Sequence, residues 1–210
     1  MSRQPIVKKG AGWLAAAALL CVASSASFVL QAHNLDELAS GMAEKTPVPI
    51  GGKFTLQDTA GRVVTDQTYA GKWQLVFFGF TSCPDVCSSV MAEVAAALED
   101  LGADAARVQP IFISMDPEQD SAQRIGDYLK AFDRRIVGLR GTDAQTQAAV
   151  KAFHVYSKKR ATGSGYTLDH SALLYLMKPD GAFGKLLNGD APGHKLGKDL
   201  RASLLQGHGS

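Results

Sequence analysis

The sequence has few cysteines, no long block of charge of one sign, and no internal repeats or low-complexity tracts. Three cysteines in 210 residues are too few for a small domain held together by disulfides. The formal net charge is +2, with acidic and basic residues mixed along the chain, which argues against a nucleic-acid partner. The length is sufficient for one domain with a substantial core and an additional segment.

An uncharged stretch at residues 11–32 follows basic residues near the amino terminus. Its length of about 20 residues suits one membrane-spanning helix, and the basic flank predicts export of the chain that follows. Because the Arg- and Ser-rich composition of an organelle presequence is missing, we expect residues 1–32 to anchor the protein in a bacterial inner membrane, with the domain in the periplasm. Cleavage at the small residues 24–26 is the alternative and would give a soluble periplasmic protein. Cys21 lies in this stretch without the small residue that precedes a lipoprotein cysteine, so we interpret it as part of the membrane segment.

Residues 33–50 are polar and rich in proline at their end, which predicts an extended linker. Residues 51–207 show the alternation of apolar and turn-forming segments that is typical of an α/β domain. We expect, in order, a β-hairpin at 54–64, a strand at 73–80, a helix at 86–101, a strand at 107–115, a helix ending near 132, a strand at 136–139, a helix ending near 153, strands at 171–177 and 182–187, and a helix at 193–206. Residues 158–166 are expected to be a basic, mobile loop. This order predicts a parallel βαβ core and a thioredoxin-like fold with an N-terminal β-hairpin extension.

Two cysteines, Cys83 and Cys87, stand where the buried strand meets the following helix. Unpaired N–H groups and the positive end of the helix dipole favour thiolate over thiol at this position. Because the thiolate attacks disulfides and binds soft metals, the pair is either redox-active or two-thirds of a metal site. The three residues between the cysteines let both sulfurs bind one ion and still form a disulfide. Two buried cysteines or a structural disulfide would be the purely structural interpretation.

Three segments together resemble the Sco/SenC family: Gly79–Cys87 (GFTSCPDVC), Ser114–Glu118 (SMDPE) and Thr167–Ala172 (TLDHSA). The resemblance extends over nearly the whole domain, about Phe54–Leu205. Members of this family are membrane-anchored copper proteins of thioredoxin-like fold that help to build the copper centre of cytochrome c oxidase. One departure is Ser88, which occupies the position after the second cysteine where the family usually has proline.

The resemblance implies that Cys83, Cys87 and His170 are copper ligands. Two thiolates and an imidazole suit Cu(I) as a three-coordinate site and Cu(II) with an added ligand. Three acidic residues are expected near the ligands or on the same face: Asp85, Asp116 and Asp169. Helix capping and turn formation explain Asp85 and Asp116 equally well.

The resemblance also implies a metallochaperone that delivers copper to the copper-accepting subunit of cytochrome c oxidase. Other periplasmic copper chaperones or thiol reductants are further expected partners, besides the membrane. The alternative is an exported thiol-disulfide oxidoreductase, in which Cys83 attacks a partner disulfide and Cys87 resolves the mixed disulfide. A peroxidase is compatible with the fold, but neither the cysteine pair nor the sequence around His170 requires that reaction.

Overall fold

A computed structural model describes residues 49–83, 86–163 and 165–206. The predicted anchor at 1–32, with Cys21, and all but the last two residues of the predicted linker lie outside these ranges. Among the described residues, no helix combines the length and the hydropathy needed to cross a membrane.

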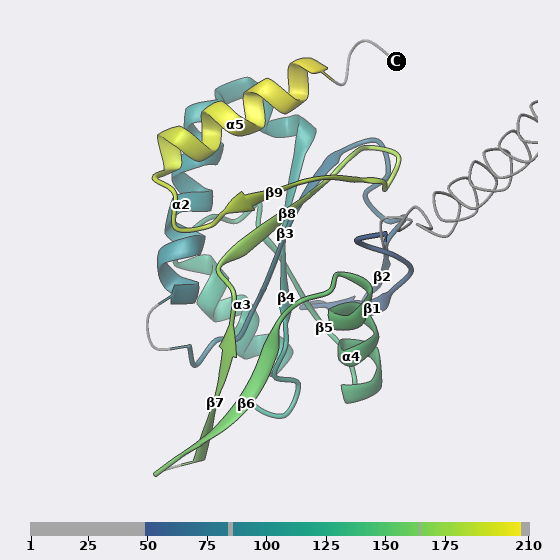
Figure 1. Cartoon of the computed structure of the whole chain (residues 1–210), viewed down its shortest axis with the longest axis vertical. Helices are drawn as coiled ribbons and strands as arrows, with labels where there is room; N and C mark the ends of the chain where they lie inside the picture. The colour runs from purple at the N-terminus through teal and green to yellow at the C-terminus, as the bar shows by residue number, and fades with distance from the viewer. Residues whose placement is uncertain (1–48, 84–85, 164, 207–210) are drawn as a thin grey trace, which may run out of the picture. The chain divides into compact units, whose positions relative to one another are not determined.

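The described chain alternates strands and helices from its start to its end (Figure 1). The elements are β1 (Thr55–Asp58), β2 (Val63–Thr65), β3 (Trp73–Gly79), α2 (Val86–Leu101), the 3-10 helix η1 (Gly102–Arg107), β4 (Val108–Ser114), α3 (Ala122–Lys130), β5 (Val137–Arg140), α4 (Asp143–Ala152), β6 (Ser157–Thr162), β7 (Gly165–His170), β8 (Leu173–Met177), β9 (Phe183–Asn188) and α5 (Gly193–Gln206).

Seven strands form one sheet in the order β2-β1-β5-β4-β3-β8-β9. Strands β3, β4 and β5 are parallel, and β8 and β9 continue the sheet in antiparallel pairs. The predicted βαβ core is therefore confirmed. The predicted amino-terminal hairpin is β1–β2, and it joins the sheet because β1 pairs with β5.

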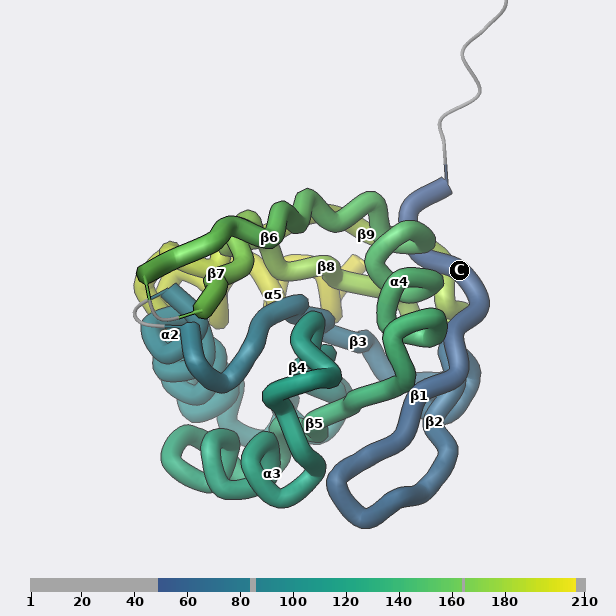
Figure 2. The backbone as a smooth tube through the Cα atoms, turned by 90° about the horizontal axis from the view of Figure 1, so that it is seen from below, coloured from purple at the N-terminus to yellow at the C-terminus, as the bar shows by residue number. Residues whose placement is uncertain are grey.

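Strand β3 is buried along its whole length, as its continuous apolar sequence predicts. Successive side chains point to opposite faces, so Leu75 and Phe77 meet α2, α3 and α5, whereas Val76 and Phe78 meet α4. Figure 2 shows α2 and α3 on one side of the central strands and α4 on the other. Layers on both faces keep water away from β3, whose carboxyl end leads directly to the cysteine pair.

Helix α2 buries one stripe of side chains against this sheet. The stripe has the three- and four-residue spacing that the sequence predicts and contains Cys87, Val90, Met91, Val94, Ala97, Leu98 and Leu101. Burial of a large aliphatic side chain contributes about 1.5–3 kcal/mol, so the stripe fixes the rotation of α2 about its axis. Cys87 thereby points into the protein and is fully buried.

The prediction of a loop at 158–166 is wrong. Residues 158–162 and 165–166 belong to a β-hairpin, β6–β7, that forms a two-stranded sheet of its own and extends away from the main body (Figure 1). All residues of β6 are exposed, and Lys158, Lys159 and Arg160 lie within it. An exposed ribbon needs no apolar alternation, which is why its sequence reads as a loop. His170 is the last residue of β7, and the next strand starts at Leu173.

Candidate metal centre

Three side chains from two distant parts of the chain meet beyond the carboxyl end of β3. The Nε2 atom of His170 lies 3.3 Å from the Sγ atom of Cys87 and 4.0 Å from that of Cys83. All three possible ligand atoms lie within 4.8 Å of one another. Within the described residues this is the one group of three or more cysteine, histidine or acidic side chains close enough to hold a metal ion.

The spacing of the ligand atoms fits one metal ion. An ion bound about 2.3 Å from a thiolate sulfur and about 2.0 Å from an imidazole nitrogen, as for Zn²⁺, holds these atoms about 3.7 Å apart when the ligands are trigonal. The two observed sulfur–nitrogen distances, 3.3 and 4.0 Å, lie on either side of this value. Two sulfurs and one imidazole form a soft donor set, which selects ions such as Cu(I).

The start of α2 sets the positions of the two reduced sulfurs. The backbone N–H of Cys87 donates to the Sγ atom of Cys83 at 3.4 Å, so the first turn of the helix holds that sulfur. The pKa of the Cys87 thiol is raised well above its ordinary value, chiefly by a hydrogen bond with Cys83 and secondly by burial. A metal ion that binds both sulfurs must therefore displace the thiol proton of Cys87. Ser88 lies in the same helical turn, and the ligand atoms converge without the usual proline.

Gly79 allows the end of β3 to approach Cys87 closely. A Cβ atom at this position would lie 3.0 Å from the Cys87 sulfur, 2.8 Å from Cε1 of Phe77 and 3.0 Å from Cε2 of Phe112. Phe77, Phe112 and Cys87 are fully buried and have no free space into which to move. Glycine at position 79 is thus required by packing around a ligand sulfur.

The imidazole of His170 has a defined orientation. Its Nδ1–H donates to the carbonyl oxygen of Ser171 at 3.1 Å, and its Nε2 atom faces the two sulfurs. The rings of Phe77 and Phe80 contact the imidazole edge-on, with centroids 5.9 and 5.7 Å away. Sequence reasoning did not identify these contacts, because a backbone carbonyl and two core aromatics carry no motif.

The three acidic residues expected near the ligands have different positions. Asp169 forms an ion pair with Arg160 at 2.9 Å and does not contact the Nδ1 atom of His170. Asp116 is buried and accepts a hydrogen bond from the hydroxyl of Tyr166 at 2.7 Å. Asp85 lies outside the described residues.

A fourth acidic residue, Asp120, supports the segment that carries Cys83. It is fully buried, and its carboxylate accepts hydrogen bonds from the backbone N–H and hydroxyl of Thr81 and from the hydroxyl of Ser114 at 2.6 Å. Thr81 precedes Cys83 by two residues, whereas Ser114 ends β4. No role for Asp120 was predicted from the sequence. Its position after a parallel strand was the available signal, since the ends of β3 and β4 lie side by side.

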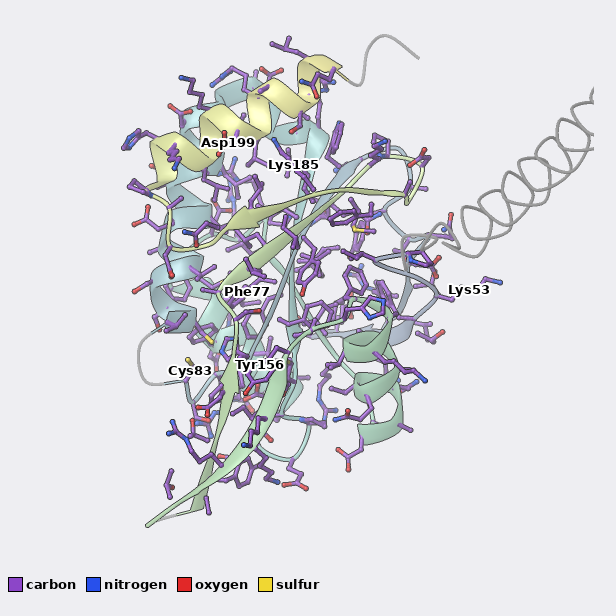
Figure 3. The ribbon with its side chains drawn as sticks, in the orientation of Figure 1. Lys53, Phe77, Cys83, Tyr156, Lys185 and Asp199 are labelled. Atoms are coloured by element: carbon purple, nitrogen blue, oxygen red, sulfur yellow. The ribbon has the colours of Figure 1, made fainter. Side chains whose placement is uncertain are left out.

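A cavity of about 430 Å³ gives access to two of the three ligands, Cys83 and His170. Its other walls come from the segment after β3, the start of α2, and the hairpin with the residue before it: Phe80, Val86, Tyr156, Arg160, Thr162, Thr167, Leu168 and Asp169. Figure 3 shows Cys83 and Tyr156 close together at this end of the molecule. Cys87 does not line the cavity, so an incoming reactant meets Cys83 and His170 first.

Comparisons with known proteins agree with this geometry. A model of the SCO1/SenC family matches residues 42–205. SenC of Rhodobacter capsulatus is 36% identical over 179 residues, which cover 84% of this chain and 81% of SenC. The mitochondrial SCO1 homolog 1 of Arabidopsis thaliana is 39% identical over 141 residues, 65% of this chain and 41% of that protein. The chain thus spans about half the length of such mitochondrial relatives.

The fold also matches that of a solved structure. Bradyrhizobium japonicum ScoI, determined with copper bound, is 42% identical and superposes with a TM-score of 0.69. The match covers 73% of this chain and 98% of ScoI. Fold, ligand geometry and sequence similarity lead to one assignment. The chain belongs to the SCO1/SenC family.

Proposed function

We propose that this protein binds one copper ion through Cys83, Cys87 and His170 and delivers it to the copper-accepting subunit of cytochrome c oxidase. The observation that carries the proposal is the convergence of two sulfurs and one imidazole nitrogen within 4.8 Å of one another. This donor set suits Cu(I) with three ligands and Cu(II) with one more. The copper bound to the related ScoI supports copper as the ion.

The exposure of the ligands suggests how copper leaves. Cys83 and His170 line the cavity, whereas Cys87 is buried behind them. A thiolate of the acceptor enters through the cavity and forms a bond to Cu(I) as the bond to His170 or Cys83 breaks. The copper keeps its oxidation state, so this exchange moves no electron. Cys87 is the last ligand to be replaced.

Copper affinity tests the binding part of the proposal. The full chain, purified in a mild detergent, is reduced and titrated anaerobically with Cu(I) against a competing chelator. We expect one tightly bound ion and a loss of affinity of at least about tenfold for His170→Ala. The matched control is His194→Ala, which removes an exposed histidine of α5 and leaves the affinity unchanged. Equal affinity of wild type and His170→Ala would remove the assignment.

A second candidate function is reduction of a partner disulfide, favoured by the unequal exposure of the cysteines. The Cys83 thiolate attacks one sulfur of that disulfide, and the other sulfur leaves as a thiolate. Cys87, deprotonated as it reacts, then attacks Cys83 and releases the second partner thiolate. Two electrons pass to the partner, and a periplasmic thiol reductant must restore the Cys83–Cys87 dithiol. This activity requires both cysteines but tolerates His170→Ala, which distinguishes it from copper binding.

We further propose that residues 1–32 anchor the protein in a bacterial inner membrane with the domain in the periplasm. The basic flank and the uncharged stretch at 11–32 support this location. Cell fractionation tests it: the protein should remain in the membrane after alkaline washing and be digested by protease added to spheroplasts. Release of a shortened chain with the periplasmic fraction would instead show cleavage.

A further inference from the structure

The β6–β7 hairpin carries His170 but has little support of its own. Within the described residues it pairs with no strand of the seven-stranded sheet, and all of β6 is exposed. An isolated two-stranded hairpin is only marginally stable in water. The position of His170 relative to the sulfurs therefore depends on side chains that connect the hairpin to the main body.

Alternate residues of β7 face the main body. Tyr166, Leu168 and His170 lie on one face of the strand, since successive side chains alternate. Leu168 packs against the hydrophobic core on both sides of the sheet. Such apolar contacts are not directional and hold the strand close without fixing its rotation. Directional contacts come from the other end of the strand, at Tyr166.

The hydroxyl of Tyr166 is held between two carboxylates. It lies 2.7 Å from Oδ1 of Asp116 and 3.0 Å from Oε2 of Glu118, and its single O–H donates a hydrogen bond that these two acceptors share. Lys159 of β6 completes the group, with Nζ 3.4 Å from Glu118 and 3.6 Å from the centre of the Tyr166 ring. Hydrogen bonds to charged groups are stronger than those between neutral groups, so these contacts restrain the hairpin.

Asp116 provides a rigid attachment point. It is 3% exposed and follows the end of β4, a central strand of the sheet. Its N–H donates to the Ser114 hydroxyl, and its carbonyl accepts from the backbone N–H groups of Gln119 and Asp120. Its second carboxylate oxygen is buried and has no hydrogen-bond partner among the described residues. Within that part of the chain, Tyr166 is the group that donates to this carboxylate.

We propose that Tyr166 is a positioning residue for the copper ligand His170. By binding Asp116 and Glu118, it fixes the rotation of β7 and so directs Nε2 of His170 at Cys83 and Cys87. The inference rests on the proposed function in that His170 is taken as a copper ligand. Asp116 then acts through Tyr166.

The test compares Tyr166→Phe with wild type in the full chain, reduced and in detergent. In the metal-free protein, NMR with labelled histidine and phenylalanine detects the contacts of the His170 ring with Phe77 and Phe80. We expect these cross-peaks to lose most of their intensity in Tyr166→Phe. We also expect Cu(I) affinity to fall about tenfold, as for loss of other groups that orient a metal ligand.

Three further variants complete the design. Tyr69→Phe removes a hydroxyl from the segment before β3, at the end of that strand opposite the cysteines, and should change neither readout. Lys159→Met should act in the same direction as Tyr166→Phe, and its exposed position makes failure to fold no concern. In a His170→Ala background, Tyr166→Phe should cause no further loss of affinity, because the residue acts through His170.

Unchanged cross-peaks in Tyr166→Phe would overturn the inference. The same tenfold loss in the His170→Ala background would also overturn it, since Tyr166 would then act independently of the histidine. If wild type bound no copper, the proposed function would fail, but the cross-peaks of the metal-free protein would still decide whether Tyr166 positions His170.

Discussion

Gly79→Ala should weaken copper binding by displacing a ligand sulfur from within the core. The added methyl would stand 3.0 Å from Sγ of Cys87 and 2.8 Å from the Phe77 ring, closer than packed carbon and sulfur atoms tolerate. Overpacking of this kind costs about 1–3 kcal/mol of stability. Since Cys87 is only 3.3 Å from the histidine nitrogen, a shift of its sulfur also changes the metal site, and we expect about a tenfold loss of Cu(I) affinity.

Gly184→Ala is the matched control. Its methyl would meet the backbone oxygen of Leu176 at 2.8 Å, beside Trp73, at the end of the sheet opposite the cysteines. Urea denaturation of the metal-free proteins should show a similar loss of unfolding free energy for both variants, about 1–3 kcal/mol. Cu(I) competition should show weaker binding for Gly79→Ala alone. Equal copper affinities for Gly79→Ala and wild type, or an equal loss for Gly184→Ala, would refute the reasoning.

Three other predictions concern stability and metal linkage. Asp120→Ala leaves the buried hydroxyl of Ser114 and the partly buried donors of Thr81 without this acceptor, and urea denaturation should show a loss of about 1–3 kcal/mol for the buried group. The hydrogen bond with Arg135 lowers the pKa of Asp133 below 3.8, so the ionised carboxylate stabilises the folded protein and Asp133→Asn should lower its stability at neutral pH. The difference in unfolding free energy between wild type and Asp133→Asn should vanish when the pH is lowered below the pKa of Asp133 in the folded protein, because the carboxylate is then protonated. Urea denaturation at a series of pH values measures this difference. Copper at 1,000 times its Kd should raise the unfolding free energy by about 4 kcal/mol, and calorimetry should show this gain disappear when a chelator removes the ion.

Much of the fold follows from local sequence patterns. The run from Trp73 to Phe80 predicted a strand buried on both faces, and the spacing from Val90 to Leu101 predicted the buried stripe of α2. Both patterns are strong because the spacing of the apolar residues identifies which faces of the strand or helix are buried. The β6–β7 hairpin gave no such signal, because an exposed ribbon is held by a few specific polar contacts at Tyr166.

The site is only partly readable from the sequence. The cysteine pair was identified from its position at a strand-to-helix junction. His170 was identified as a ligand only through the family resemblance, because 83 residues separate it from Cys87. The carbonyl of Ser171 belongs to no motif, and the carboxylate of Asp120 had only its position after a parallel strand as a signal. Their roles depend on which chain ends meet in space, and that is a property of the sheet rather than of a motif.

Transfer of copper to a reduced acceptor distinguishes copper delivery from thiol reduction. The Cu(I)-loaded full chain is mixed anaerobically with the metal-free, fully reduced copper-accepting domain of cytochrome c oxidase, and the copper on each protein is measured after separation. Because the acceptor is already reduced, thiol reduction cannot contribute. We expect most of the copper to move to the acceptor. Retention of copper, together with reduction of the acceptor when it is supplied as a disulfide, would contradict copper delivery and establish the oxidoreductase instead.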